Sequence, residues 1–419
     1  MHLHKTLILA IVASSAMYAE AVTENVVANT STGGLLVNTT ETTNSTYEAS
    51  CDQKPSGLSY EVRFKQNLVA TGSTFSTTDG YDPFVNSQTD NPTRSGSIIF
   101  DGTVEATGCN FTTGNYTSGN ITFNNNVELN EGNTFVSRGG QQIHFTKTAT
   151  ANGDNKFIGG VSATNFVVKS GTQTFVREDN PSNRVNAPSQ TLTFSQIGFA
   201  EDADDTARID ISSINVPTRT VDGYQKGGAY GAVNFGGNSE ITTLNVELSD
   251  TIGLSINGTL TVRVTVTISG KTGVKFGENG MLIFEIDSIA ELMVQTMLLT
   301  LDGEGNVPML SVADGVDMSN AKVGLYFTEN ALAEMDAMGS DITLNLDKVT
   351  NVDGLELALA VDESTGKTVE EVFGTTSFTT KEFGSGNNNI TLGENVPEPT
   401  TATLSLLALA ALAARRRRK

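Results

Sequence analysis

Short runs of alternating apolar and polar residues recur along most of the chain, separated by turns rich in Gly, Asn and Asp. The stretches LSYEVRF (58–64) and GSIIFDGTVEA (96–106) alternate with a period of two. In TVRVTVTI (261–268) the same period is predicted to place Val262, Val264, Val266 and Ile268 on one face and Thr261, Arg263, Thr265 and Thr267 on the other. The pattern predicts an all-β chain.

A loose repeat organises these strands. EGNTFV (131–136), GDNKFIG (153–159) and GTQTFV (171–176) each place a Gly/Asn turn before an aromatic and a β-branched residue. Phe135, Phe157 and Phe175 are 22 and then 18 residues apart, close to the length of one solenoid coil. The repeat favours a right-handed parallel β-solenoid, or β-helix, with the Phe side chains stacked on an internal ladder. A tandem β-sandwich is the alternative, because short strands with frequent turns are typical of that fold too.

The body divides into four zones. Residues 22–50 are rich in Thr and Asn and are predicted to be disordered. An N-terminal β region (51–120), the solenoid coils (121–290) and a C-terminal β/cap region (291–395) follow. The cap is expected to contain a short helix over Ala331–Met338, with Thr328 or Asn330 as N-cap and Gly339 as C-cap. The order of segments over 281–349 resembles the distal part of autotransporter-like surface proteins, whose last coils end in a cap.

The N-terminus has the three regions of a secretory signal peptide. Lys5 precedes an apolar run from Leu7 to Ala13, and Ala19-Glu20-Ala21 fits an A-x-A cleavage site. Residues 1–21 are therefore predicted to be removed, and the Sec translocon and signal peptidase are expected partners.

The C-terminal segment 396–419 has three parts: Val396-Pro397-Glu398-Pro399, an apolar run from Thr400 to Ala414, and the cations Arg415, Arg416, Arg417, Arg418 and Lys419. As a helix the 15-residue run would span about 22 Å, against about 30 Å for the hydrocarbon core of a membrane. Snorkelling arginines can extend it, and the positive-inside rule places them in the cytoplasm. The basic cluster is thus predicted to fix a membrane anchor.

This ending resembles the PEP-CTERM protein-sorting signal of Gram-negative bacteria, a short tail also catalogued as the ice-binding protein C-terminal domain. The resemblance implies recognition of Val396, Pro397, Glu398 and Pro399 by a membrane-embedded exosortase, cleavage there, and retention at the cell surface or in an extracellular polysaccharide matrix. Both prolines forbid helix propagation, which suits an extended recognition segment. A plain tail anchor without cleavage uses the same residues.

Charge excludes one class of partner. The whole chain has a net charge of −21. Removing six cations (Lys5, Arg415–Arg418, Lys419) and two anions (Glu20, Glu398) from 26 and 47 leaves 20 and 45 in residues 22–397, a net charge of −25. Nucleic acid is therefore not an expected partner.

The chain has two cysteines, Cys51 and Cys109. In an exported protein a disulfide between them is the expected state, and it would stabilise the fold by about 4 kcal/mol; two free thiols are the alternative. Neither cysteine has a partner at metal-ligand spacing.

The remaining candidates for chemistry are few. His144, the one histidine after the signal peptide, lies between Ile143 and Phe145 and is predicted to be exposed on a strand. No cofactor is expected; as an alternative, calcium could bind the acidic clusters Asp202, Asp204, Asp205 and Asp302, Glu304. Their spacing matches no known calcium motif.

The sequence as a whole predicts an exported, membrane-anchored protein with a structural or adhesive role and no catalytic activity. Two alternatives come from other classes: a carbohydrate-active β-helix enzyme, that is a polysaccharide hydrolase or lyase, and a calcium-dependent module that binds glycans. Paired carboxylates would distinguish the hydrolase, but 45 acidic residues make such pairs uninformative in sequence.

Overall fold

The computed structural model describes a defined part of the chain. The described residues are 25–28, 35–49, 60–77, 96–114, 119–138, 141–176, 191–213, 219–221, 224–226, 232–248, 253–270, 274–288, 310–312, 322–338, 342–345, 349–350, 356–373, 377–379 and 389–392.

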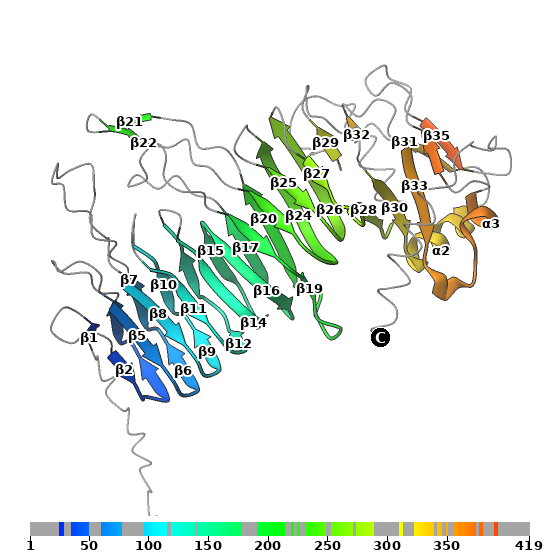
Figure 1. Ribbon diagram of the computed structural model, residues 1–419. Helices are drawn as coiled ribbons and strands as arrows, with labels where there is room; N and C mark the ends of the chain where they lie inside the picture. The colour runs from blue at the N-terminus through cyan, green and yellow to red at the C-terminus, as the bar shows by residue number, and fades with distance from the viewer. Residues whose placement is uncertain are drawn as a thin grey trace, which may run out of the picture.

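These residues form a parallel β-solenoid (Figure 1). Within the described part of the chain most strands belong to a 16-stranded sheet and a 15-stranded sheet, which we call sheet A and sheet B. Two further sheets have two antiparallel strands each, one of them formed by β21 (Arg219–Val221) and β22 (Tyr224–Lys226). Apart from the pair at the C-terminal end of sheet A, every strand in the two sheets pairs with its neighbours in parallel. The predicted solenoid is confirmed, and the tandem β-sandwich is wrong, because sandwich sheets are antiparallel.

Each coil passes through three strand positions. The first lies in sheet B: β2 (Leu35–Val37), β5 (Tyr60–Phe64), β8 (Gly96–Phe100), β11 (Ile121–Phe123), β14 (Ile143–Ala151), β16 (Val161–Val168), β18 (Leu192–Phe194), β23 (Val233–Phe235), β25 (Leu254–Ile256) and β27 (Val274–Phe276). The second continues sheet B around a corner: β3 (Glu41–Thr43), β6 (Leu68–Thr71), β9 (Val104–Thr107), β12 (Val127–Leu129), the second halves of β14 and β16, and β19 (Ile197–Phe199).

The third position lies in sheet A, which faces the first across the core. Its strands are β1 (Asn25–Ala28), β4 (Thr46–Ala49), β7 (Thr74–Thr77), β10 (Asn110–Thr112), β13 (Thr134–Val136), β15 (Asn155–Ile158), β17 (Thr172–Val176), β20 (Arg208–Ser213), β24 (Ser239–Leu248), β26 (Thr259–Gly270), β28 (Met281–Ile286), β30 (Val323–Phe327), β33 (Glu356–Val361) and β34 (Ser377–Thr379), with β29 (Leu310–Val312) and β32 (Val349–Thr350) beside them.

The C-terminal end of the stack carries short helices and a pair of antiparallel strands. These elements are α2 (Glu329–Met338), the 3-10 helix η1 (Glu363–Thr365), α3 (Val369–Phe373), and the antiparallel pair β31 (Ile342–Asn345) and β35 (Asn389–Leu392). The predicted helix is confirmed, and Thr328 is its N-cap, since its hydroxyl accepts a hydrogen bond from the N–H of Ala331. Gly339 lies outside the described residues.

Two facing columns of aromatic rings fill the core of the first six coils. In sheet A the ring centroids of Tyr47, Phe75, Phe111, Phe135, Phe157 and Phe175 follow one another at 5.3, 4.9, 4.7, 4.7 and 4.5 Å. In sheet B those of Phe64, Phe100, Phe123 and Phe145 follow at 4.8, 4.8 and 5.0 Å. Parallel in-register pairing at about 4.8 Å produces this spacing, and the two columns meet edge to face. The predicted stack of Phe135, Phe157 and Phe175 is confirmed.

The sixth coil exchanges two core positions. Ala163 stands where the preceding coil has Phe145, and Phe166 stands beside Ala149. The ring of Phe166 lies edge-on to Phe157 and Phe175, with centroids 5.4 and 5.3 Å apart. A large side chain thus replaces a small one at the adjacent position, which keeps the core filled.

A buried column of polar side chains runs through the corner before each sheet A strand. Asn133, Asn155 and Gln173 are at most 3% exposed. The amide of Asn133 donates to the Asn155 carbonyl at 2.9 Å, and that of Asn155 donates to Gln173 at 3.0 Å. The Asn133 carbonyl accepts from the backbone N–H of Cys109 at 2.9 Å. These bonds satisfy groups whose burial would otherwise cost about 1 to 3 kcal/mol each.

Two segments differ from the sequence predictions. Residues 25–28 and 35–49 form strands rather than disordered chain, because Tyr47 and Ala49 supply an alternating buried face that joins the core. The coils therefore begin well before residue 121.

Val264 is 49% exposed, whereas Val262 and Val266 are buried, because a β-bulge between Val262 and Thr265 shifts the alternation. Thr261, predicted on the outer face, is buried.

The corner that contains the polar column requires left-handed backbone. Asn44, Gly72, Gly108, Gly132, Gly153 and Gly171 take positive φ there. At Gly171, with φ of +68°, an added Cβ would lie 2.4 Å from the carbonyl carbon of Gly153, whereas at Gly108, with φ of +61°, it would meet nothing within 4 Å.

Alanine at these two glycines should separate backbone strain from steric overlap. Gly108→Ala is expected to destabilise the protein by about 1 kcal/mol through strain alone, and Gly171→Ala by at least about twice as much, because the backbones of adjacent coils must also move apart. Urea denaturation followed by far-UV circular dichroism measures both. Equal losses for the two variants would contradict the close approach of the coils at Gly171.

Candidate functional site

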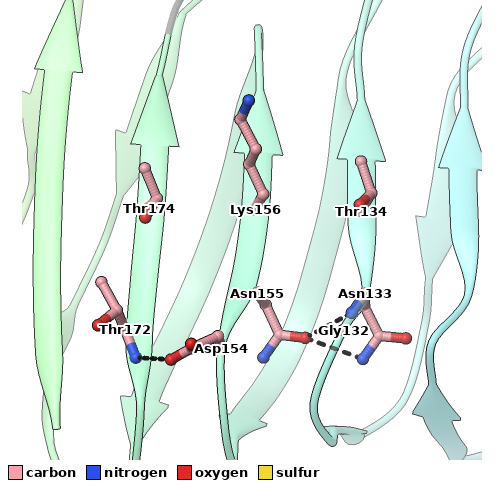
Figure 2. Close-up of a pocket in the computed structure, with 8 residues that line it drawn as sticks. All are labelled: Gly132, Asn133, Thr134, Asp154, Asn155, Lys156, Thr172 and Thr174. Atoms are coloured by element: carbon pink, nitrogen blue, oxygen red, sulfur yellow. Dashed lines mark hydrogen bonds between the residues drawn. The ribbon is translucent and has the colours of Figure 1, made fainter. Parts of the chain in front are cut away.

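The outer face of sheet A contains a shallow open hollow of about 240 Å³. Its lining residues come from β13, β15, β17 and the turns before them: Gly132, Asn133, Thr134, Asp154, Asn155, Lys156, Thr172 and Thr174 (Figure 2). Strand alternation turns Phe135, Phe157 and Phe175 into the core and therefore points Thr134, Lys156 and Thr174 outward.

Two charged groups lie at opposite ends of the hollow. Figure 2 shows the Lys156 side chain extending along β15 away from Asp154. The Asp154 carboxylate accepts a hydrogen bond from the backbone N–H of Thr172 at 2.7 Å, which fixes it to the neighbouring coil. The hollow thus offers threonine hydroxyls and one exposed ammonium group, the chemistry of hydrogen bonding to hydroxyl or carboxylate groups.

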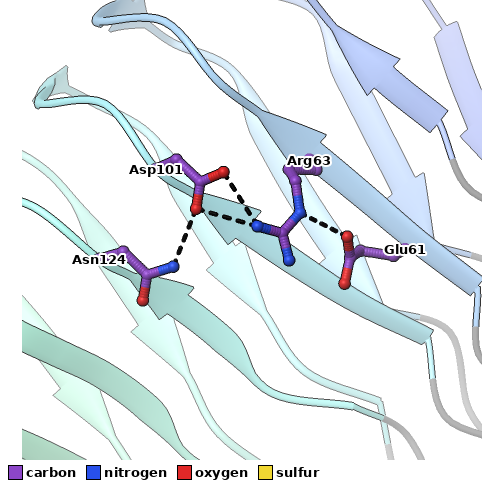
Figure 3. A network of polar contacts seen from close by, with 4 residues as sticks. All are labelled: Glu61, Arg63, Asp101 and Asn124. Carbon is purple, nitrogen blue, oxygen red and sulfur yellow. Dashed lines mark hydrogen bonds and ion pairs between the residues drawn. The ribbon is translucent and has the colours of Figure 1, made fainter.

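Sheet B carries a network of four polar side chains that links three coils (Figure 3). Arg63 donates to Glu61 at 2.6 Å through Nε and to Asp101 at 2.9 and 3.1 Å through one terminal nitrogen. Asn124 donates to the same Asp101 carboxylate at 2.9 Å. The hydrogen bonds that Arg63 donates to Glu61 and then to Asp101 raise the pKa of Arg63. Those from Asn124 and then Arg63 lower the pKa of Asp101. The network therefore connects three successive coils through side-chain hydrogen bonds.

The structure does not arrange Asp202, Asp204 and Asp205 as a metal site. Asp202 lies 3.6 Å from the ammonium of Lys169, and Asp204 accepts hydrogen bonds from the N–H and hydroxyl of Thr206 at 2.9 and 2.5 Å. Asp205 is exposed on the same turn between β19 and β20. Nowhere in the described ranges do three or more His, Cys, Asp or Glu side chains form a group that could hold a metal. Asp302 and Glu304 lie outside those ranges.

The single histidine of the body stands on the outer face of β14, in register with Thr122 and Ser162. His144 is half-buried, more than the sequence predicted, and burial lowers its pKa. Burial thus favours the neutral imidazole, and its register neighbours on the adjacent strands are the hydroxyl residues Thr122 and Ser162.

Cys109 occupies a place in the buried polar column. Its side chain is fully buried, and burial raises the pKa of the thiol. Cys51 lies outside the described residues, so the disulfide between the two stays a prediction.

Sequence reasoning missed the outward Thr column of sheet A. Thr46, Thr74, Thr134, Thr174, Thr243 and Thr265 occupy equivalent register positions on six strands. The signal is the residue before each core aromatic, as in T-F-S (74–76) and T-F-V (134–136). Aligning the strand segments on their Phe residues reveals the Thr column, although connections of unequal length between the strands obscure the repeat.

Loss of the Asp101 carboxylate should weaken stability in a pH-dependent way. The pKa of Asp101 in the folded protein lies below its value of about 3.9 in the unfolded chain. The carboxylate therefore contributes to the stability of the fold above about pH 3.9, and this contribution is lost as the pH falls through the folded pKa. Asp101→Asn is expected to lose at most about 1 kcal/mol at pH 7, since these side chains are about 30% exposed, and less at pH 3. Urea midpoints at both pH values measure this, with Asp205→Asn as an exposed control. A loss that is equal at the two pH values would refute the ion pair.

The Cys109 thiol should resist alkylation until the protein unfolds. The native mature protein is expected to leave Cys109 unmodified by iodoacetamide, because the thiol is buried and its thiolate is disfavoured. In urea, peptide mass spectrometry should find Cys109 alkylated only after reduction if the predicted disulfide with Cys51 is present, and alkylated without reductant if both thiols are free. Modification of Cys109 in the native state would contradict its burial.

Two predicted segments lie outside the described residues: the sorting motif Val396–Pro399 with its basic end Arg415–Lys419, and the signal peptide 1–21. Among the residues that the structure does describe, no helix is long and apolar enough to cross a membrane.

Comparison with known proteins identifies the C-terminal segment. No curated protein and no solved structure matches the chain. The resemblance to autotransporter-like proteins therefore stays a prediction. A family model described as the PEP-CTERM protein-sorting motif matches residues 395–419. The β-solenoid chain thus carries a PEP-CTERM protein-sorting motif at residues 395–419, and this motif implies an exported protein that an exosortase processes and that is attached to the membrane through this segment.

Proposed function

We propose that the solenoid is a structural or adhesive element, anchored first through the segment after Thr400 and then retained at the cell surface or in the extracellular matrix of a Gram-negative bacterium. The observation that carries this proposal is the order of the chain, in which a continuous solenoid precedes a PEP-CTERM motif at 395–419. An exported protein with this ending needs a body that stays folded outside the cell.

The shape of the body supports a structural role. Ten sheet B strands stack in register from Leu35 in β2 to Val274 in β27, which at about 4.8 Å per step corresponds to a rod about 43 Å long. Each coil contacts mainly its neighbours, so the rod holds surface groups at fixed distances from its anchored end.

The surface hollow supports a role without catalysis. Glycoside hydrolysis uses two carboxyl groups about 5 to 9.5 Å apart, one on each side of the scissile bond. The hollow has a single carboxylate, that of Asp154, which is hydrogen-bonded to the Thr172 N–H. Among the residues that the structure describes, the two carboxylates whose pKa is shifted, Asp101 and Glu371, both have a lowered pKa, which is opposite to that of a general acid.

Processing of the tail tests the proposal in the native cell. Mass spectrometry of the mature protein is expected to find a C-terminus near Pro399 and an N-terminus near Val22. The double variant Pro397→Ala, Pro399→Ala should stay uncut and keep Lys419, because the extended recognition segment is lost. Ser405→Ala, inside the apolar run, is the matched control and should be processed normally.

Two results would oppose the proposal. An intact Lys419 in the native protein would make the tail a plain anchor without exosortase cleavage. New reducing ends or unsaturated sugar products, released from polysaccharides by the purified mature protein and absent with buffer alone, would instead favour the hydrolase or the lyase.

A further inference from the structure

We infer that the N-terminal end of the solenoid binds the same end of a second copy of this chain, so that two bodies meet tip to tip about a two-fold axis. The inference deepens the proposed function and rests on it, because it assigns the partner of an adhesive element. We call this end, blue in Figure 1, the solenoid tip. Its strands are β1, β2 and β3, each of which pairs with another described strand on one side only.

Backbone N–H groups at the solenoid tip point away from the body. One coil further in, the N–H of Val69 donates to the preceding coil at 2.9 Å. Glu41 is in register with Val69, so its N–H points the same way, out of the open end, and strand alternation gives Thr43 the same direction. The hydroxyl groups of Thr39 and Ser45 donate to the carbonyls of Glu41 and Thr43. The N–H groups are therefore the ones that a further strand would use.

The strand β2 adds apolar surface to the solenoid tip. Leu35 faces the core in register with the fully buried Val62, yet it is only half-buried, because no described coil lies beyond it. Leu36 is 59% exposed and is the most exposed large hydrophobic side chain among the described residues. In a later coil the core-facing Ile98 donates its N–H to the following coil at 3.1 Å. The N–H of Leu36, one position further along the strand, therefore points to the open end.

Little of the mature chain precedes the solenoid tip. Cleavage after Ala21, as predicted, leaves residues 22–24 before β1, whereas the coil step from Ile143 to Val161 takes 18 residues. Three residues cannot form a further coil over the tip. The ten strand residues of the tip also include no Lys and no Pro, the residues that protect sheet edges, whereas β27 at the other limit of sheet B carries the exposed Lys275. An unprotected edge of this kind is a template for another chain.

A second copy of the same tip suits this edge. A two-fold axis across the tip reverses the direction in which the coils run, so the edges of the two copies meet antiparallel and hydrogen-bond to each other. Glu41 is the one charged residue among the ten, in a body whose net charge is −25, so two copies repel each other least here. At the other end sheet A finishes with β34, which pairs antiparallel with β33, and parallel stacking head to tail cannot continue there. The contact is therefore closed at a dimer.

The solenoid tip is small, which makes each contact weak. A coil of 18 residues has a perimeter of about 60 Å, and with its outward side chains it covers an area of about 400 Å². A stable interface buries about 800 Å² on each partner. Contacts between many anchored copies would act together, however, and their combined strength exceeds that of one contact. The tip lies at the opposite end of the chain from the sorting motif, so it is the part of an anchored body that meets another body.

Sedimentation velocity of the purified mature protein, at about 5 to 500 μM, tests the inference in this weak range. A reversible equilibrium between monomer and dimer is expected, without larger species. The dimer should become more populated as salt is added, because screening weakens the repulsion between two bodies of net charge −25. Small-angle X-ray scattering should give the dimer about twice the length of the monomer, whereas side-by-side packing would leave the length unchanged.

Two variants of Leu36 locate the contact. Leu36→Glu is expected to weaken dimerisation about tenfold or more, because two new carboxylates would enter a contact that already contains Glu41 of each copy. Val264→Glu is the matched control, since it adds the same charge at a 49% exposed residue of β26 and should leave dimerisation unchanged. Leu36→Pro removes an N–H that points to the open end and should weaken dimerisation about fivefold or more. Far-UV circular dichroism and urea midpoints confirm that each variant is folded.

Three results would overturn the inference: a monomer at every concentration, equal weakening by Leu36→Glu and Val264→Glu, or a dimer as short as the monomer. Cell fractionation separates the inference from the proposed function, and Leu36→Glu protein is expected to be sorted normally with its tail cut. If wild-type protein is sorted normally but stays monomeric, the inference fails and the proposed function stands. If wild-type protein is not exported, the proposed function fails, whatever its oligomeric state in solution.

Discussion

Parallel pairing of each coil with the next, in register at about 4.8 Å, is the constraint on which the other features of the molecule depend. It places each side chain directly beside the residue at the same position of the neighbouring coil. A buried side chain must therefore pack well against a side chain of the same kind in the neighbouring coil. Phe does so in the two columns with ring centroids 4.5 to 5.0 Å apart, and Asn or Gln does so by donating its amide to the next carbonyl. The same constraint turns isolated threonines into a surface column.

The stack also shows how much departure this constraint permits. At the sixth coil Ala163 interrupts the column of Phe rings, and Phe166 restores the lost volume from the next strand position. At β26 an extra residue shifts the alternation and exposes Val264. Both irregularities coincide with a local shift in register, and the backbone pairing between the coils resumes after each of them.

The fold could be predicted where the coils follow one another with short connections. Phe135, Phe157 and Phe175 are 22 and 18 residues apart, so their column was visible in sequence. Phe64 and Phe100 belong to an equally regular column, but they are 36 residues apart because a longer connection joins β7 to β8. The first coil has many polar residues and few core residues such as Tyr47 and Ala49, so its composition is typical of a disordered segment. The sorting motif is contiguous and can be read directly from the sequence, whereas the outward Thr column of sheet A exists only once register brings separate strands together.

The direction of the hydrogen bonds has a mechanical consequence for an anchored rod. Bonds between coils run along the solenoid axis, so tension between a C-terminal tether and the far end of the rod would peel coils apart one interface at a time, without shearing many together. Each released coil would add chain length, about 60 Å for the 18-residue step from Ile143 to Val161 and more where connections are long. The molecule would therefore lengthen in steps under load and dissipate force while its remaining coils stayed folded.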